Sequence, residues 1–441
     1  MKNRNLIFII SILLTSSQLY GQSKLWDLEA CIEYANDNNK KLLTQTQRIK
    51  VSEFELKNSK SKLIPEIEGT VELNHYWAIP VQVFPGELVG EPAGTYIPVE
   101  LGTPFMGNIG VQANWTILDP SLYQKIKEKE LQEQVSNYKL ESVQQSLIRN
   151  VRMAFYQSIL KGKQVENTKK ELDNYTVTHN LIYQKFDKGL IDKITINQSK
   201  SILNSIKQNL TNVKLEQQKA LLSLKFWMAY PMNDTIKLVS IGTLDTKQVN
   251  SVPFSVESLP DYHLQKSEVL LAKQELKYIH SQLYPSLSIQ AGYSKLGFGD
   301  KLNFVTEQQW FNSGFVGLNL TVPLFSFSKH IYHPKKQKSL IEAKELEFEE
   351  YQEEARRKFI NEKMALEAAL TKINTQEEQV QLAKENLQLS REKIEKGIVD
   401  MISLKQIFQD LNEAQERLYS ARLEALQHHV ALDYLQQNNL K

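Results

Sequence analysis

The chain has 441 residues and an almost neutral balance of 53 Lys plus Arg against 51 Asp plus Glu, which excludes a dedicated nucleic-acid binder with a basic surplus. Its single cysteine, Cys31, excludes an intramolecular disulfide framework and any metal site built from several cysteines. No run reaches the roughly 18 apolar residues of a membrane-spanning helix, so helices are not expected to carry the chain through a membrane.

The first 22 residues have the order of a secretory signal peptide. Lys2 and Arg4 form a basic start, residues 6–14 are apolar except for Ser11, and polar residues follow up to Gln22. This apolar stretch is too short to span a bilayer as a helix. We therefore expect residues 1–22 to be removed and the mature chain to be exported.

Four segments alternate strictly between apolar and polar residues, which predicts strands with one apolar and one polar face. They are residues 67–73, 109–117, 287–293 and 316–322. Aromatic residues toward the strand ends, such as Phe315, and a polar second face are typical of transmembrane strands. The residues expected to face the lumen of such a barrel are Glu68, Gln112, Asn114, Gln290 and Asn319.

Four strands do not close a barrel, and lipid does not tolerate open sheet edges. If these strands cross a membrane, several chains must therefore share one barrel, and oligomerisation is required. The alternative is a soluble sandwich with one solvated face. The signal peptide and the long helices described next favour the membrane interpretation.

Long heptad repeats follow the strands in each half of the chain. Apolar residues recur every seven positions through residues 359–394 and again through 404–432. The corresponding segments of the first half are residues 151–186 and 196–224. A sustained heptad predicts coiled-coil packing, and a helix over residues 121–187 would be about 100 Å long. The small residues in these seams fit a helical barrel and a simple antiparallel hairpin equally well.

The chain contains one internal duplication. Residues 188–194 (KGLIDKI) match residues 396–402 (KGIVDMI) at their Lys, Gly, Asp and Ile positions. Similarity at such a long period indicates two copies of one supersecondary unit. We predict copies over residues 23–230 and 259–441, joined by an equatorial linker at 231–258. Earlier motifs match at a different offset, which places a longer loop in the first copy.

Residues 25–35 (LWDLEACIEYA) resemble the opening helix of TolC-type outer membrane efflux proteins. Residues 322–325 (VPLF) resemble the motif that closes the last strand of that family, and the two glycine-centred turns resemble its periplasmic helix tips. The resemblance covers nearly the whole mature chain. It implies an α+β membrane fold: a homotrimer with a transmembrane β-barrel shared between the chains, four strands from each, and a long coiled-coil α-helical barrel across the periplasm.

Two positions depart from the family pattern. Some relatives carry acidic residues at a constriction just after the second tip, where this chain has Ser403 and Gln406. The resemblance therefore does not imply an acidic gate here. In addition, the small residue that usually follows the last-strand motif is replaced by residues 326–328 (SFS).

The two repeated turns are predicted to reverse long helices, because glycine is common just past a helix end. A bare helix hairpin needs only the glycine, so the charged and apolar residues beside it indicate a docking partner, which we expect to be a periplasmic adaptor. The alternative is a turn that both copies share because folding needs it. The predicted docking residues are Lys188, Gly189, Leu190 and Asp192 in the first turn and Lys396, Gly397, Ile398 and Asp400 in the second.

No catalytic, cofactor or metal site is predicted, and the chain is not expected to be an enzyme. His330 and His333, and the adjacent His428 and His429, lack the third convergent ligand that a metal site needs. His179 is expected to be packed or to line the first tip. Phosphate-binding loops, nucleophile elbows and dinucleotide fingerprints are missing from the sequence.

Two classes of function fit the sequence. The first is a passive exit duct in the outer membrane, surrounded by outer-membrane lipid and driven by an inner-membrane pump through the periplasmic adaptor, as in tripartite efflux or type I secretion. The second is a non-conducting periplasmic coiled-coil scaffold or adaptor in which the strands form a soluble sheet. The sequence favours the duct but names no cargo, because a lining of Gln, Asn and Glu does not encode a substrate.

Overall fold

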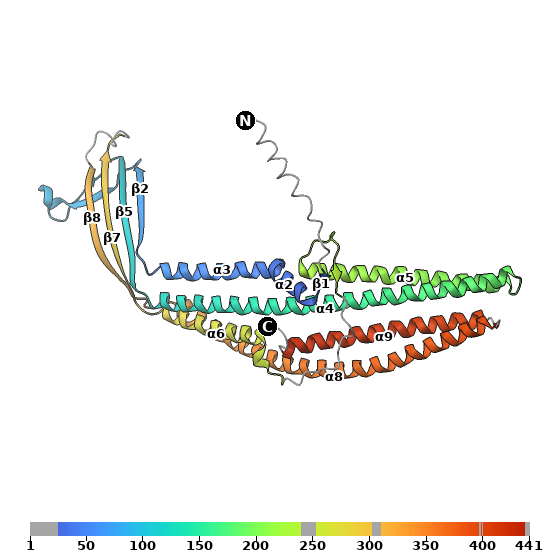
Figure 1. Cartoon of the computed structure of the whole chain (residues 1–441). Helices are drawn as coiled ribbons and strands as arrows, with labels where there is room; N and C mark the ends of the chain where they lie inside the picture. The colour runs from blue at the N-terminus through green and yellow to red at the C-terminus, as the bar shows by residue number, and fades with distance from the viewer. Residues whose placement is uncertain (1–24, 240–252, 302–309, 397, 399, 437–441) are drawn as a thin grey trace, which may run out of the picture. The chain divides into compact units, whose positions relative to one another are not determined.

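The computed structural model describes residues 25–239, 253–301, 310–396, 398 and 400–436 (Figure 1). The predicted signal peptide lies outside the described residues. The described chain folds into two compact units. We call the unit formed from residues 1–47, 138–264 and 349–441 the helical unit, and the unit formed from residues 48–137 and 265–348 the sheet unit. Within the described ranges, none of the helices combines the length and the hydropathy that a bilayer span requires.

The order of the elements repeats once along the chain. The first half contains α2 (Leu28–Asn38), α3 (Lys40–Ser61), β2 (Glu66–His75), β5 (Phe105–Leu118), α4 (Pro120–Asp187) and α5 (Lys193–Met228). The second half contains α6 (Pro260–Ser281), β7 (Ser286–Gly299), β8 (Trp310–Thr321), α8 (His333–Glu395) and α9 (Met401–Gln436). Each half thus gives two main strands between helices, then a long helix and a shorter returning helix. The boundaries of the two copies remain a prediction, because each compact unit combines segments of both halves.

The sheet unit contains an antiparallel four-stranded sheet in the order β2-β5-β7-β8 (Figure 1). Its strands cover the four alternating segments of the sequence except for Val322, which follows the end of β8, and all four begin before those segments. Pairing is continuous apart from a register shift between Thr116 and Leu118, near the end of β5. The central pair joins the last strand of the first half to the first strand of the second half. The duplication therefore produces one sheet rather than two.

A two-stranded ribbon lies between β2 and β5 in the sequence. It consists of β3 (Val81–Pro85) and β4 (Tyr96–Glu100), joined through a 3-10 helix at Gly86–Val89. This ribbon occupies the place where the change in offset predicts a longer loop. Its strands are not expected from the sequence, because prolines at positions 85 and 98 interrupt any alternating pattern. Proline is tolerated at edges, and both strands of a ribbon are edges.

The helical unit is held together along the heptad seams. Every seventh residue from Leu366 to Ile394 in α8 is buried, and so is every seventh residue from Leu404 to Leu432 in α9. Between α4 and α9, the rings of Tyr175 and Phe408 meet edge to face with centroids 4.7 Å apart. The predicted seams of the second half are therefore confirmed as packing surfaces.

The N-terminal segment of the described chain packs against the end of α5. Strand β1 (Leu25–Trp26) pairs in parallel with β6 (Lys237–Leu238), which lies in the predicted linker. The ring of Trp26 contacts both Tyr34 and Tyr230 edge to face. Asp27 caps α2 by accepting a hydrogen bond from the Ala30 N–H at 2.8 Å. The opening motif and part of the linker thus share one core of the helical unit.

Candidate channel wall and helix tips

The strand register puts the predicted lumen residues on one face of the sheet. Glu68 stands opposite Gln112, and Asn114 stands opposite Gln290. Asn319 stands opposite Ser288, two residues from Gln290 on the same face. This face also carries Glu66 and Glu72 from the edge strand β2. We call it the polar face; its carboxylates and amides would be wet in any assembly that lines a pore.

The opposite face of the sheet is exposed and is apolar except for Lys295 and Asn312, which stand opposite each other far from the helices. Val316 and Leu318 in β8 are 79% and 72% exposed. Their neighbours on the same face are Ala291 and Ile289 in β7. An apolar surface of this kind is uncommon in monomeric soluble proteins and indicates that something covers it.

Phe315 does not belong to the apolar face. Its partner in the register is Gly292, on the polar face. A Cβ added to Gly292 would come within 2.7 Å of the Phe315 ring, so the ring lies directly over this glycine. The glycine makes room for an aromatic side chain inside the polar lining.

Each outer strand of the sheet has one unpaired edge among the described residues. β2 pairs with β5 and β8 pairs with β7, and neither pairs with another strand on its other side. Unpaired strand edges expose N–H and C=O groups that template pairing with another chain.

The first predicted tip is a tight glycine turn between α4 and α5. Gly189 has φ +72°, a conformation that glycine adopts without steric penalty. The Leu190 N–H donates to the Lys185 carbonyl at 2.9 Å, which closes the end of α4. Asp192 then caps α5 by accepting from the Thr195 N–H at 2.8 Å. Hydrogen bonding by Thr195 holds the pKa of Asp192 below its usual value.

The second predicted tip, between α8 and α9, repeats this arrangement where it is described. The Ile398 N–H donates to the Lys393 carbonyl at 2.9 Å, the counterpart of the bond made by Leu190. Asp400 caps α9 by accepting from the Ser403 N–H at 3.1 Å and from the Ser403 hydroxyl. Gly397 lies outside the described residues. Gln406, at the other position where some relatives are acidic, donates to Asp410.

Both tips expose apolar side chains beside their charges. Leu190 is 70% exposed and Ile402 is 74% exposed, and Ile194 and Ile398 are exposed as well. The turn and cap bonds use backbone groups, the two aspartate carboxylates and the Ser403 hydroxyl, so they do not require these aliphatic side chains. The exposed aliphatic groups at both tips are therefore surplus to the needs of the turn.

A lysine that the sequence does not single out links the two hairpins near the tips. The ammonium of Lys185 in α4 donates to the carbonyl oxygens of Ile394 and Glu395, in the last turn of α8. A cation at a helix C-terminus satisfies free carbonyls and complements the helix dipole. No motif identifies this contact, because its partners are main-chain atoms about two hundred residues away in the sequence.

The same part of the helical unit buries an acidic side chain. Glu171 in α4 is only 8% exposed, and both of its carboxylate oxygens lack a hydrogen-bond partner. Burial raises the pKa of Glu171 to about 7, against the opposing effect of the Arg391 charge from α8. The Nε of Arg391 is likewise buried without a partner. This acid was not expected from the sequence, where it reads as one of many helix-surface glutamates.

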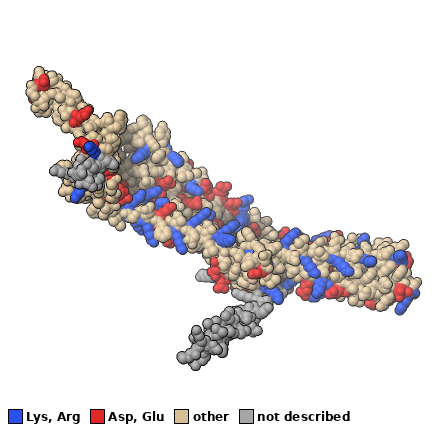
Figure 2. Space-filling view, turned by 90° about the horizontal axis from the view of Figure 1, so that it is seen from above, with Lys and Arg blue, Asp and Glu red and all other residues tan. Residues whose placement is uncertain are grey.

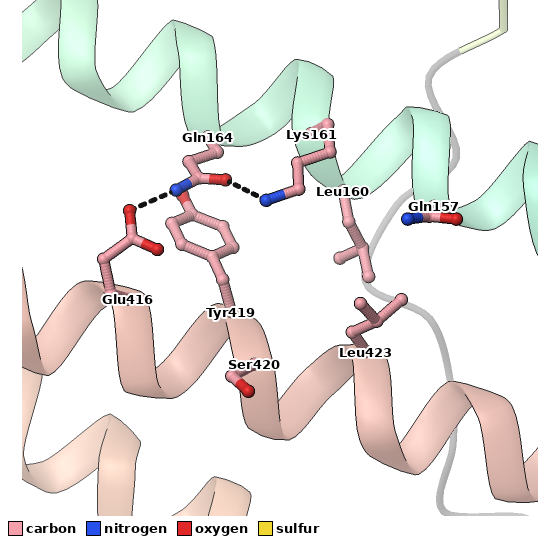
Figure 3. A pocket seen from close by; sticks show the side chains of 8 residues that line it. All are labelled: Gln157, Leu160, Lys161, Gln164, Glu416, Tyr419, Ser420 and Leu423. Atoms are coloured by element: carbon pink, nitrogen blue, oxygen red, sulfur yellow. Dashed lines mark hydrogen bonds between the residues drawn. The ribbon is translucent and has the colours of Figure 1, made fainter. Parts of the chain in front are cut away.

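A cavity of about 250 Å³ lies between α4 and α9 (Figure 3). The amide of Gln164 donates to Glu416 at 2.5 Å and accepts from Lys161 at 3.1 Å. Leu160 and Leu423 point toward each other beside this chain of polar groups (Figure 3). The polar atoms are thus paired with one another, and the arrangement serves to hold the two helices together.

The candidate histidines take part in ordinary pairs. His428 Nδ1 lies 2.7 Å from Glu362, and His333 Nε2 lies 3.0 Å from the Ser328 hydroxyl. His179 Nδ1 lies 2.7 Å from the Ser199 hydroxyl, and partial burial lowers the pKa of this histidine. In the part of the chain that the structure describes, no three His, Cys, Asp or Glu side chains converge on a possible metal position.

Comparison with known proteins matches most of the chain to one family. The sequence model of the family described as outer membrane efflux protein matches residues 31–229 and 264–435. Toxin and drug export protein A of Aggregatibacter actinomycetemcomitans is 25% identical over 185 residues, which cover 41% of this chain and 40% of that protein. The chain therefore matches about two fifths of the length of this relative.

Solved structures share the fold over almost the whole chain. The outer membrane protein VceC of Vibrio cholerae superposes with a TM-score of 0.73 at 13% identity, covering 94% of this chain and 97% of VceC. The CmeC outer membrane channel of Campylobacter jejuni gives 0.72 at 15% identity, covering 93% of this chain and 85% of CmeC. CusC gives 0.72 at 14% identity and covers 95% of both chains.

Proposed function

We propose that this chain, which belongs to the outer membrane efflux protein family, forms a trimeric exit duct through the outer membrane. Family membership confirms the predicted location in the outer membrane with a large periplasmic portion, and the prediction that the protein is not an enzyme. The observation that carries the proposal is the sheet: one exposed apolar face, one polar face and two unpaired edges.

A lipid bilayer would cover the apolar face, and closure of the sheet into a barrel would pair its two free edges. A membrane sheet must close so that no backbone group stays unpaired, and the edges of β2 and β8 close the sheet if β8 of one copy pairs with β2 of the next. Two copies would give eight strands, whose interior is filled by side chains, whereas a larger barrel leaves an open lumen. Three copies and twelve strands are therefore the arrangement we propose, with the polar face lining the lumen.

The long helices would continue the duct through the periplasm. Their heptad seams favour side-by-side packing. With α4, α5, α8 and α9 from each chain, three copies would supply twelve helices for the wall of a tunnel. The chain has no nucleotide-binding motif, so we propose passive conduction, with an inner-membrane pump supplying the energy through a periplasmic adaptor. The name of the Aggregatibacter relative favours an efflux or secretion cargo, which the lining of this chain does not specify.

The two tips are the proposed docking sites for the adaptor. In the described residues they share the hydrogen bond that closes the long helix, an aspartate cap and exposed aliphatic residues that these bonds do not need. Lys188 and Lys396 would supply the matching positive charges of the docking surface. An adaptor with apolar helical tips and acidic groups beside them would fit this surface.

Charge reversal at both tips tests the docking assignment. Lys188→Glu combined with Lys396→Glu should leave the oligomer intact and abolish export and crosslinking to the adaptor. The matched control is Lys200→Glu with Lys214→Glu, which changes two exposed lysines on α5 outside the turns. Export at the wild-type level, with normal abundance of the doubly reversed protein, would show that the tips are not the docking sites.

Membrane fractionation distinguishes the duct from a periplasmic scaffold. We expect the protein in the outer-membrane fraction as a detergent-stable, heat-modifiable oligomer. Recovery as a soluble periplasmic monomer would reject the duct and leave the scaffold as the function.

A further inference from the structure

Four helices meet the four-stranded sheet at one end of its strands. At this end β2 and β7 begin and β5 and β8 finish, because neighbouring strands are antiparallel. α3 and α6 end just before it, α4 begins just after it, and a short π-helix at Ser328–Tyr332 leads from it into α8 (Figure 1). We define the junction belt as two stretches next to this end of the sheet. Residues 57–64 are the end of α3 and the residues that follow it, and residues 324–341 run from just after β8 into the start of α8.

The junction belt carries positive charge only. Residues 57–64 contain three lysines, residues 324–341 contain four, and neither stretch contains an acidic residue. All seven lysines are exposed. On the face that Figure 2 shows, Lys and Arg side chains are interspersed with Asp and Glu over the helices as a whole. Among the described residues, only Lys60 has a carboxylate partner, Glu130 at 3.1 Å. The seven lysines are Lys57, Lys60, Lys62, Lys329, Lys335, Lys336 and Lys338.

Helix stability explains Lys60, which is in the last turn of α3, where a positive charge complements the helix dipole. It does not explain Lys335 and Lys336. The π-helix Ser328–Tyr332 continues directly into α8, and the His333 N–H donates to the Ser328 carbonyl, so these two lysines are not at a free helix end.

Exposed apolar side chains lie between these lysines and the apolar face of the sheet. Leu324 is 87% exposed, and Ile64, Phe325 and Phe327 are each more than half exposed. From the sheet toward the helices, the chain therefore presents an apolar strand face, then exposed aliphatic and aromatic side chains, then lysines. A bilayer presents the same order to a protein: hydrocarbon, interface and charged headgroups.

We propose that the junction belt binds the headgroups of anionic phospholipids in the leaflet nearest the helices. This inference rests on the proposed function, because it needs the apolar face to lie in a bilayer. The lysines are spread over separate helix ends and stand beside apolar side chains. That arrangement suits a charged membrane surface, whereas a single small anion needs donors that converge on one point.

The test measures lipid preference at the surface of the reconstituted full chain. The protein is placed in phosphatidylcholine vesicles that contain a trace of spin-labelled phosphatidylglycerol or spin-labelled phosphatidylcholine, and the protein-bound fractions are compared. We expect wild type to prefer phosphatidylglycerol by about fivefold, the ratio that one lysine near a charged bilayer surface contributes. The variant Lys62→Gln, Lys335→Gln, Lys336→Gln, Lys338→Gln removes four of the six belt lysines that have no carboxylate partner among the described residues and should lose most of this preference.

The control variant removes the same number of exposed lysines from the helical unit: Lys169→Gln, Lys200→Gln, Lys207→Gln, Lys214→Gln. It should keep the wild-type preference. If the belt variant keeps the preference, or if the control loses it equally, the belt is not the binding surface. Replacing chloride by inorganic phosphate at constant ionic strength should leave the preference unchanged. Loss of the preference in phosphate would assign the lysines to a free anion and overturn the proposal.

Conductance separates this inference from the proposed function. In membranes of phosphatidylcholine alone, the belt variant and wild type should conduct equally. Equal conductance with no lipid preference in wild type would reject the belt and keep the duct. A wild-type protein that enters the bilayer without conducting would reject the duct itself.

Discussion

At the scale of single residues, Glu171 is the side chain whose environment conflicts most with its charge. Its carboxylate oxygens are buried without hydrogen-bond partners, and burial raises its pKa to about 7. Because the folded protein holds this proton more tightly than the unfolded chain, the group stabilises the fold at low pH. That contribution is lost as the pH rises from the usual value of 4.5 to about 7 and stays lost above it.

Glu171→Gln should therefore change the pH dependence of stability. The amide resembles the protonated acid, so we expect equal stability of variant and wild type at pH 4 and a gain of roughly 1–3 kcal/mol for the variant at pH 8. Chemical denaturation followed by the helical circular dichroism signal measures this. Glu367→Gln, at an exposed position of α8, is the control. If Glu171→Gln changes the free energy of unfolding by the same amount at every pH, the carboxyl does not titrate in this range.

At the scale of elements, the end of α8 depends on a side chain from α4. Lys185 donates to the carbonyls of Ile394 and Glu395, which have no partner inside their own helix. Lys185→Met keeps the aliphatic part of the side chain and removes these bonds, so the last turn of α8 should lose about 1–2 kcal/mol of local stability.

Amide hydrogen exchange measures this loss directly. Faster exchange is expected for residues 392–396, without a change in the middle of α8. Lys170→Met is the matched control, because Lys170 pairs with Glu166 of its own helix on an exposed surface. Unchanged exchange at residues 392–396 would show that the lysine does not hold the helix end.

The two faces of the sheet should respond in opposite ways to charge. Leu318→Arg puts a cation on the apolar face and should impair membrane assembly by roughly 2–4 kcal/mol per chain if the site lies near the bilayer midplane. Asn319→Arg puts the same cation on the polar face, where it should be tolerated and should alter ion selectivity. Ile289→Arg and Gln290→Arg form the equivalent pair on β7. Equal assembly of both members of a pair would contradict the assignment of the faces.

Local patterns in the sequence predicted the elements that depend on local rules. The seven-residue repeats predicted the buried seams, and Gly189 predicted the turn of the first tip. Features that depend on distant partners were not predictable in this way. The contact of the Phe315 ring with Gly292 requires the register of β7 and β8, and the contact of Lys185 requires the packing of α4 beside α8. The β3-β4 ribbon lacks a pattern because prolines interrupt it.

At the scale of the whole molecule, a single chain leaves surfaces that need partners. Within the described ranges, its sheet has an uncovered apolar face and two unpaired edges, and its tips expose aliphatic side chains. A membrane, two further copies and an adaptor would satisfy these three needs separately. The family to which the chain belongs is consistent with all three.

Single-channel recording of the purified oligomer in a planar phosphatidylcholine bilayer tests the central claim most directly. We expect long-lived conductance steps that favour cations, because Glu66, Glu68 and Glu72 put carboxylates and no lysine or arginine on the polar face of β2. Replacing these three glutamates by glutamine should keep the steps and reduce the cation preference. Stable insertion of the wild-type oligomer without any conductance step would contradict the account.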